Sequence, residues 1–107
     1  MKIARCTCRH SRVPREVWWP LPLAGLLHQV SQIELITCEI ETDSGLRGFG
    51  YTYTLGHGGV GVQAILAHEI APVLIGREID ELGGLWNELW WRLHWVGRAG
   101  VVPVAMA

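Results

Sequence analysis

A glycine-rich segment is the first feature of the sequence that could bind a ligand. Gly56, Gly58 and Gly61 have the spacing G-x-G-x-x-G and lie between a strand-like stretch and a helix-like one. That spacing is typical of loops that hold a dinucleotide pyrophosphate at the start of a helix. Such loops follow a buried parallel strand, whereas residues 46–54 are rich in Gly, Tyr and Thr and are predicted to be one arm of an antiparallel hairpin. A flexible loop is therefore the favoured interpretation, and a nucleotide-binding module is the less favoured alternative.

Two further groups of residues resemble metal sites. Cys6, Cys8 and His10 would share one face of a strand, and thiolate and imidazole are zinc ligands. Same-face residues of a strand are about 7 Å apart, so we expect these to be small core residues that do not converge on an ion. His68 and Glu69 begin like the H-E-x-x-H zinc motif, but position 72 is proline where the second histidine belongs. We therefore predict neither metal ligands nor catalytic residues in this chain.

The composition excludes several classes of function. The chain has 107 residues, enough for one domain, and a net charge of −1, which provides no attraction for nucleic acid. Its longest apolar stretch, residues 17–27, is interrupted by two prolines and is too short to cross a bilayer. Three cysteines without a secretion signal indicate reduced thiols. We expect a cytoplasmic protein with neither nucleic acid nor a membrane as a partner.

The elements that must position these residues follow from the hydrophobic pattern. Alternation of apolar and polar residues predicts strands over 2–12, 32–42 and 46–54. The tight turn predicted at residues 43–45 makes the last two strands antiparallel. Residues 13–31 are apolar and interrupted by proline, so we expect a long loop that packs against another surface.

The second half of the chain has helical periodicity. A helix is predicted from Val60 to the region of Pro72 and Gly76, and Asp80 is expected to cap a second helix that ends at residues 97–100. The apolar stripe of the second helix comprises Leu82, Leu85, Trp86, Leu89, Trp90 and Leu93. Further tryptophans at 91 and 95 lie on another helical face and need a second surface. The predicted fold class is α+β, a three-stranded antiparallel meander followed by a helical bundle.

The order of these elements resembles the N-terminal capping domain of the enolase superfamily. Residues 34–50, ELITCEIETDSGLRGFG, resemble its strand-turn-strand segment, and residues 70–77, IAPVLIGR, followed by Leu85 and Trp86, resemble its next signature. Residues 50–54, GYTYT, with the glycine loop after them, are similar to the mandelate racemase/muconate lactonizing enzyme family, and within it to galactarate- and talarate-type acid-sugar dehydratases. These motifs cover most of residues 32–107.

The resemblance implies a cap over the mouth of a β/α barrel, in which two loops close over an acid-sugar carboxylate. The loops correspond to residues 21–31 and 52–59, and the implied substrate-binding residues are Thr52, Tyr53, His57 and His28. In this family a Lys or His removes the proton α to the carboxylate and Mg²⁺ stabilises the enediolate. Both groups belong to the barrel, so the resemblance assigns no catalytic residue and no Mg²⁺ ligand to this chain.

The resemblance also bears on where the chain stops. The family continues past the position of Ala107 into the barrel, so we expect residues 1–107 to be a truncated capping domain that is inactive by itself. The enzyme would be a dehydratase or a racemase and would form a homo-oligomer. The alternative from another functional class is a stand-alone interaction or dimerisation module.

Overall fold

The protein is an α+β domain whose sheet precedes its helices, as the sequence predicts. A computed structural model describes the backbone of residues 1–23, 26–97 and 99–107, and the side chains of these residues outside 15–31. The three strands are β1 (Ile3–Leu23), β2 (Leu26–Thr42) and β3 (Arg47–Thr54). They form one antiparallel sheet in the order β1-β2-β3, so β2 is central.

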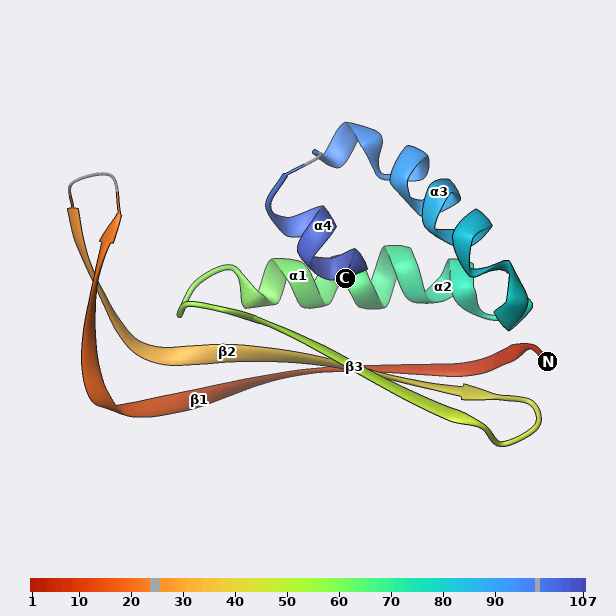
Figure 1. The fold of residues 1–107 in the computed structure, drawn as a ribbon, viewed down its shortest axis with the longest axis horizontal. Helices are drawn as coiled ribbons and strands as arrows, with labels where there is room; N and C mark the ends of the chain where they lie inside the picture. The colour runs from red at the N-terminus through yellow and green to blue at the C-terminus, as the bar shows by residue number, and fades with distance from the viewer. Residues whose placement is uncertain (24–25, 98) are drawn as a thin grey trace.

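The hairpin of β1 and β2 is much longer than the sequence analysis predicts. The loop expected over residues 13–31 is wrong, because pairing continues to Pro14, opposite Gln32, and resumes from Trp19, opposite Val30, to Leu23, opposite Leu26. The prolines of this segment are tolerated because β1 is an edge strand, where a missing N–H need not break the ladder. Figure 1 shows that the outer part of this hairpin bends and extends beyond the helices.

One continuous helix follows the sheet. It comprises α1 (Gly59–Ile65), a π-helical turn η1 (Leu66–Ile70) and α2 (Ala71–Leu74). The predicted helix is confirmed, but Pro72 does not end it. Proline lacks the N–H for the usual bond to the fourth residue before it, and the wider π turn directly precedes this position. The helix ends at Leu74, and Gly76, two residues later, has φ +83°.

The remaining helices are short, apart from α3. They are η2 (Ile79–Glu81), α3 (Leu82–Arg92), η3 (His94–Val96) and α4 (Val101–Met106). The prediction that Asp80 caps the second helix is wrong, because Asp80 lies within η2 and α3 has no side-chain cap. Among the described residues, no helix has both the length and the apolar character needed to cross a membrane.

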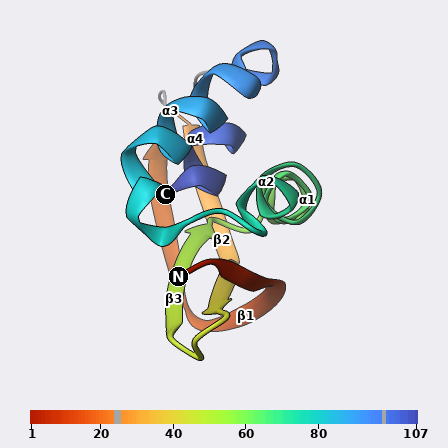
Figure 2. The ribbon, with the colours of Figure 1, turned by 90° about the vertical axis from the view of Figure 1, so that its right-hand side faces the viewer.

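All the helices lie on one side of the sheet, as Figures 1 and 2 show. The core between the layers includes Ile36 of β2, Val62 of α1 and Leu89 of α3. Of the predicted stripe, Leu85, Leu89 and Leu93 are buried, but Leu82 is 73% and Trp86 47% exposed. The predicted stripe is therefore wrong at these two positions, because α3 buries a narrower face than expected.

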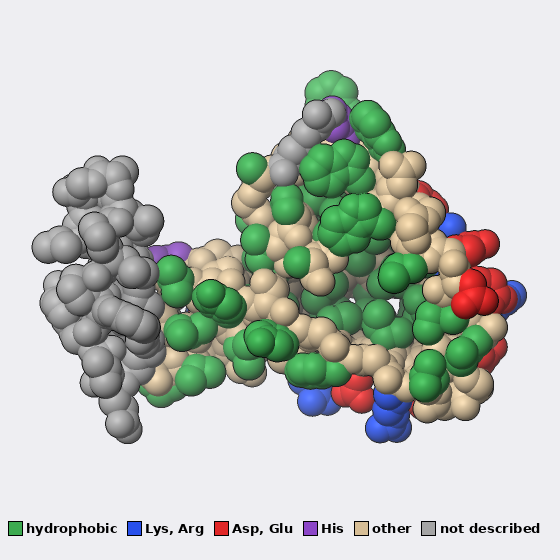
Figure 3. All heavy atoms as spheres, viewed as in Figure 1, with side chains coloured by type: hydrophobic (Ala, Val, Ile, Leu, Met, Phe, Trp, Pro, Cys, Tyr) green, Lys and Arg blue, Asp and Glu red, His purple; other side chains and the backbone are tan. Residues whose placement is uncertain are grey.

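Residues paired directly across the strands share one face of the sheet. The row Cys8, Cys38 and Gly50 lies under the helices, whereas the next row, Thr7, Glu39 and Phe49, faces away from them. Figure 3 shows charged side chains along this second face. This register places Phe49, Tyr51 and Tyr53 of β3 on the open face and Gly48, Gly50 and Thr52 on the face under the helices.

Candidate functional site

The carboxylate of Glu34 binds both ends of the loop over residues 55–58. Glu34 lies in β2 and is only 3% exposed. Its Oε2 accepts a hydrogen bond of 2.9 Å from Oγ1 of Thr54, the last residue of β3. The same oxygen accepts a hydrogen bond of 2.7 Å from the backbone N–H of Gly59, the first residue of α1. One buried side chain therefore fixes the point where the loop leaves the sheet and the point where it enters the helix.

Two basic side chains of β1 face the other oxygen of this carboxylate. The Nε of Arg12 lies 3.5 Å from Oε1 of Glu34, and Nε2 of His10 lies 3.3 Å from it. The hydrogen bond from Gly59, reinforced by Thr54 and Arg12, holds the pKa of Glu34 below its ordinary value. Glu34 is consequently an anion at neutral pH, and its charge is compensated inside the fold.

Glycine is required at three positions around this loop. A Cβ on Gly59 would lie 2.6 to 2.8 Å from atoms of the Glu34 side chain, which is closer than non-bonded atoms approach. Gly56 and Gly58 both have φ +86°, a left-handed conformation that residues with a Cβ adopt at a cost. Close approach to Glu34 thus accounts for Gly59, and the backbone path of the loop accounts for Gly56 and Gly58.

The geometry argues against the nucleotide-binding alternative. A bound pyrophosphate would need the free N–H groups at the start of the helix, but the N–H of Gly59 is already bonded to the carboxylate of Glu34. The preceding strand, β3, is an antiparallel strand at the edge of the sheet and not a central parallel one. An anion from solvent would therefore compete with a carboxylate that the protein itself supplies.

The structure separates the residues implied to contact a substrate. Thr52 and Tyr53 are neighbours on β3, so their side chains point to opposite faces of the sheet. Thr52 is half-buried beside Ile36, whereas Tyr53 is 58% exposed on the face away from the helices. His57 is exposed in the loop. Thr52 and Tyr53 therefore cannot contact one small ligand from the same side of the sheet.

His28 lies in the outer part of β2, where its backbone pairs with Leu21. Its side chain lies outside the described residues. Figure 1 shows that this outer hairpin and the loop between β3 and α1 lie toward the same end of the molecule. The two segments implied to close over a substrate are thus on the same side of the domain, and the contacts of these four residues with a substrate stay predictions.

The main pocket is apolar. It has a volume of about 370 Å³ and opens between β3, α3 and α4, with Ile40, Tyr51, Leu74, Leu82, Trp86 and Met106 among the lining residues. Figure 3 shows hydrophobic side chains around this hollow. The described lining residues include no charged side chain. Such a pocket offers neither an acid–base pair nor a partner for a carboxylate, so it is not a site for an acid sugar.

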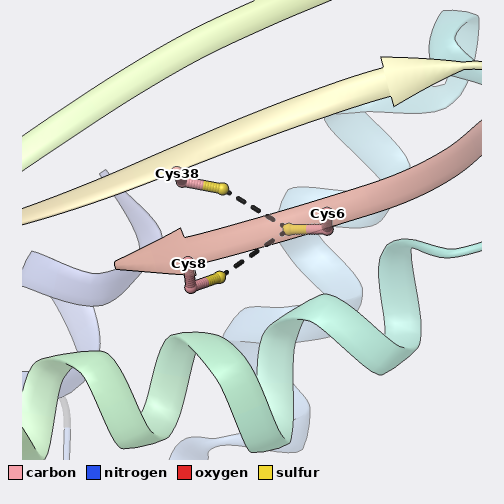
Figure 4. A group of neighbouring side chains, drawn as sticks. All are labelled: Cys6, Cys8 and Cys38. Atoms are coloured by element: carbon pink, nitrogen blue, oxygen red, sulfur yellow. Dashed lines mark hydrogen bonds between the residues drawn. The ribbon is translucent and has the colours of Figure 1, made fainter. Parts of the chain in front are cut away.

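The described residues bring one group of three potential metal ligands together. Cys6 and Cys8 of β1 and Cys38 of β2 place their sulfur atoms within 4.8 Å of one another (Figure 4). The sequence analysis considered His10 as the third ligand and missed Cys38. The register shows why, since Cys38 is directly opposite Cys8 on the same face. Combining the alternation of the two strands with their pairing would have revealed the cluster.

The sequence analysis also missed Glu34, the side chain that organises the loop. A signal was present, because the inward-facing positions 36, 38 and 40 of β2 continue back to position 34. A carboxylate on the inward face of a strand needs partners inside the fold. Which partners it finds, however, depends on the end of β3 and the start of α1, which only the three-dimensional structure brings together.

Comparisons with known proteins agree with this architecture. The family model described as "Mandelate racemase / muconate lactonizing enzyme, N-terminal domain" matches residues 9–106. The chain is 42% identical over 91 residues, 82% of its length, to a 3,6-anhydro-alpha-L-galactonate cycloisomerase of Streptomyces coelicolor. It is 31% identical over 85 residues, 79% of its length, to an L-talarate/galactarate dehydratase of Salmonella typhimurium. These matches span 25% and 21% of the two relatives, so the chain corresponds to about a quarter of each.

Solved structures resemble the whole chain. A racemase from Streptomyces coelicolor A3(2) with bound magnesium has a TM-score of 0.88 and 33% identity, over 96% of this chain and 28% of that one. An L-talarate dehydratase from Polaromonas sp. JS666, complexed with Mg and L-glucarate, has a TM-score of 0.82 and 29% identity, over 97% and 28% of the two chains. The meander and the helices therefore match a domain that occupies part of a longer protein in both cases.

Proposed function

Because the chain belongs to the family of mandelate racemase/muconate lactonizing enzyme N-terminal domains, we propose that it is the substrate cap of a larger enzyme that acts on an acid-sugar carboxylate. The reaction class is removal of the proton α to a carboxylate, followed by elimination or by reprotonation. The role of the cap is to close over the substrate and exclude water. The remainder of the enzyme supplies the base and the metal.

The anchoring of the loop over residues 55–58 is the observation that carries this proposal. A loop that closes over a substrate needs fixed ends and a span whose backbone can change conformation. Glu34 fixes both ends through Thr54 and Gly59. Gly56 and Gly58 provide backbone freedom between them. The imidazole of His57, at the centre of this span, is the side chain that closure would bring to the substrate.

Mg²⁺ is assigned to the part of the enzyme beyond this domain. Mg²⁺ prefers carboxylate, carbonyl and water oxygens, whereas the only group of three potential ligands among the described residues consists of thiols. The described residues therefore do not fit this ion, and no step of the reaction passes through a metal held by the cap. The magnesium-containing relatives support its presence in the complete enzyme.

The proposal is tested first on the coding sequence and then on the protein. A reading frame that continues past codon 107 into alternating strands and helices with metal-binding carboxylates supports a cap. The protein of that full frame, supplied with Mg²⁺ and a panel of aldonates and aldarates, is expected to convert at least one of them. The polypeptide of residues 1–107 serves as the control and is expected to convert none.

Two outcomes would overturn the proposal. Turnover by residues 1–107 alone would show that the catalytic groups lie in this domain. A stop codon directly after residue 107, together with a monodisperse folded domain, would favour the stand-alone interaction module. The apolar pocket between β3, α3 and α4 is the feature that such a module would use, and light scattering of either form tests the predicted homo-oligomer.

A further inference from the structure

The three cysteines form a compact cluster on the helix-covered face of the sheet. The Sγ atoms of Cys6 and Cys8 are 3.9 Å apart, and those of Cys6 and Cys38 are 3.4 Å apart. Figure 4 shows the three side chains pointing toward one another from two adjacent strands, above the helix that covers them. All three are free thiols and are half-buried. All three cysteines of the chain therefore belong to this cluster.

The spacing of the sulfur atoms matches that of a metal-thiolate site. Zinc–sulfur bonds of about 2.3 Å at tetrahedral angles place neighbouring sulfurs about 3.8 Å apart. The sulfur separations from Cys6 to Cys8 and from Cys6 to Cys38, 3.9 and 3.4 Å, lie on either side of that value, and all three sulfurs are within 4.8 Å of one another. An ion could therefore bind with small rotations of the side chains. The expectation that Cys6, Cys8 and His10 do not converge on one ion agrees with the structure, because His10 is not in the group. The sulfurs of Cys6 and Cys8 nevertheless approach each other, and Cys38 from the neighbouring strand is the third member.

A disulfide between the two closest sulfurs fits this arrangement less well. The closest sulfurs belong to Cys6 and Cys38, which are diagonal neighbours, because Cys38 pairs directly with Cys8 and Cys6 pairs with Ile40. Diagonal neighbours have Cα atoms about 7 to 8 Å apart, beyond the usual limit of about 6.8 Å for a disulfide. Any single disulfide also leaves the third thiol without a partner. A metal ion, in contrast, can be bound by all three at once.

We propose that Cys6, Cys8 and Cys38 form a three-thiolate site for a soft closed-shell cation, Zn²⁺ or Cu⁺. Thiolates select these ions over Mg²⁺, so the site is chemically distinct from the magnesium chemistry of the enzyme. Three ligands complete a trigonal Cu⁺ site, or leave one position of a tetrahedral Zn²⁺ site for a ligand from solvent. The site links β1 to β2 beneath the helices and acts as a structural cross-link.

Metal binding at this cluster exchanges protons for an ion. Binding forms three metal–sulfur bonds and releases the protons that the thiols still carry to the buffer. No electron is transferred, so neither an oxidant nor a reductant is required.

The test uses the protein as its gene encodes it, reduced and freed of metal. Zn²⁺ is titrated in competition with a chromophoric chelator, and Cu⁺ is supplied in a separate titration from a Cu⁺-selective chelator. The wild-type protein is expected to bind one equivalent of Zn²⁺, of Cu⁺ or of each through its thiols. Cys6→Ser and Cys38→Ser are expected to lose this binding. Thr7→Ser, on the opposite face between Cys6 and Cys8, is the matched control and is expected to retain it.

A second measurement needs no variant and therefore does not depend on how the serine proteins fold. The wild-type protein is alkylated with and without the ion, and the modification of each cysteine is read by peptide mass spectrometry. Protection of all three cysteines together supports the site. If the three cysteines are modified to the same extent with and without either ion, the proposal is overturned. It is also overturned if both serine variants still bind one equivalent of the ion.

Discussion

The carboxylate of Glu34 accepts a hydrogen bond from the backbone N–H of Gly59 at 2.7 Å, across 25 residues of sequence. This contact joins the central strand of the sheet to the first turn of the helix that covers it. With the bond from Thr54 to the same oxygen, it sets the geometry of the loop proposed to close over a substrate. The first two predictions concern this contact.

Gly59→Ala is expected to destabilise the domain by about 1–3 kcal/mol, the usual cost of overpacking. The new methyl group would lie within 2.8 Å of Glu34 atoms, so either the carboxylate or the start of α1 must shift. Urea denaturation measures the change. Gly83→Ala is the matched control, because nothing lies within 4 Å of that Cβ and alanine stabilises a helix relative to glycine by up to about 1 kcal/mol. Equal effects of the two substitutions would contradict the close approach.

Glu34→Gln is expected to weaken the acid dependence of stability. The folded-state pKa of Glu34 is lowered, so its contribution is fully present above the unfolded value of about 4.3. It is lost as the pH falls through the lowered folded-state pKa. Thermal denaturation between neutral pH and strong acid is expected to show a smaller loss of Tm in the variant than in the wild type. Glu39→Gln, on the open face of the sheet, is expected to keep the wild-type profile, and an unchanged profile for Glu34→Gln would refute this role.

Leu85→Ala and Leu82→Ala form a matched pair on α3. Leu85 is 2% exposed, so its truncation leaves a cavity and is expected to cost about 2–5 kcal/mol. Leu82 is mostly exposed, and its truncation is expected to change the free energy of unfolding by less than about 0.5 kcal/mol. Chemical denaturation of both variants distinguishes the two positions. A similar cost at both would mean that the exposed part of α3 is covered by another part of the protein in solution.

His57→Ala, in the complete enzyme, is expected to raise KM several-fold and to reduce proton exchange at saturating substrate much less. The reason is that the proposed role of the loop is closure, while the base lies elsewhere. Steady-state kinetics and the exchange of the α-proton with deuterated solvent measure the two effects separately. Loss of exchange at saturating substrate would instead indicate a direct part in the chemistry. Val60→Ala, whose exposed side chain follows the anchor Gly59, is the nearby control.

Much of the fold could be predicted from local patterns. The alternation in β2 and β3 and the turn at residues 43–45 fix a hairpin register, and the period of the helix after Gly59 is clear. The outer hairpin could not be predicted in this way. Its prolines and its lack of alternation between apolar and polar residues argue against a strand at the level of single residues, and pairing with the opposite strand stabilises it.

The site was less predictable, because its key contacts are distant in sequence. The glycine pattern indicates a loop, but the reason for glycine at position 59 is the side chain of Glu34, which approaches from another strand. In the same way, Cys38 joins the cysteines of β1 through the register of the hairpin. A group of side chains contributed by two strands can be predicted only when the inward faces of the strands and their register are considered together.

The π turn over Leu66–Ile70 has a consequence for how this domain can vary in length. A π turn is equivalent to one additional residue within an α-helix. Deleting one codon there would restore regular α-helix and leave the following side chains on nearly the same faces, because the wider turn already absorbs the additional residue. Ile70, now buried, would therefore keep facing the core. This segment is consequently where homologues are expected to lose one residue with the least disturbance of the core.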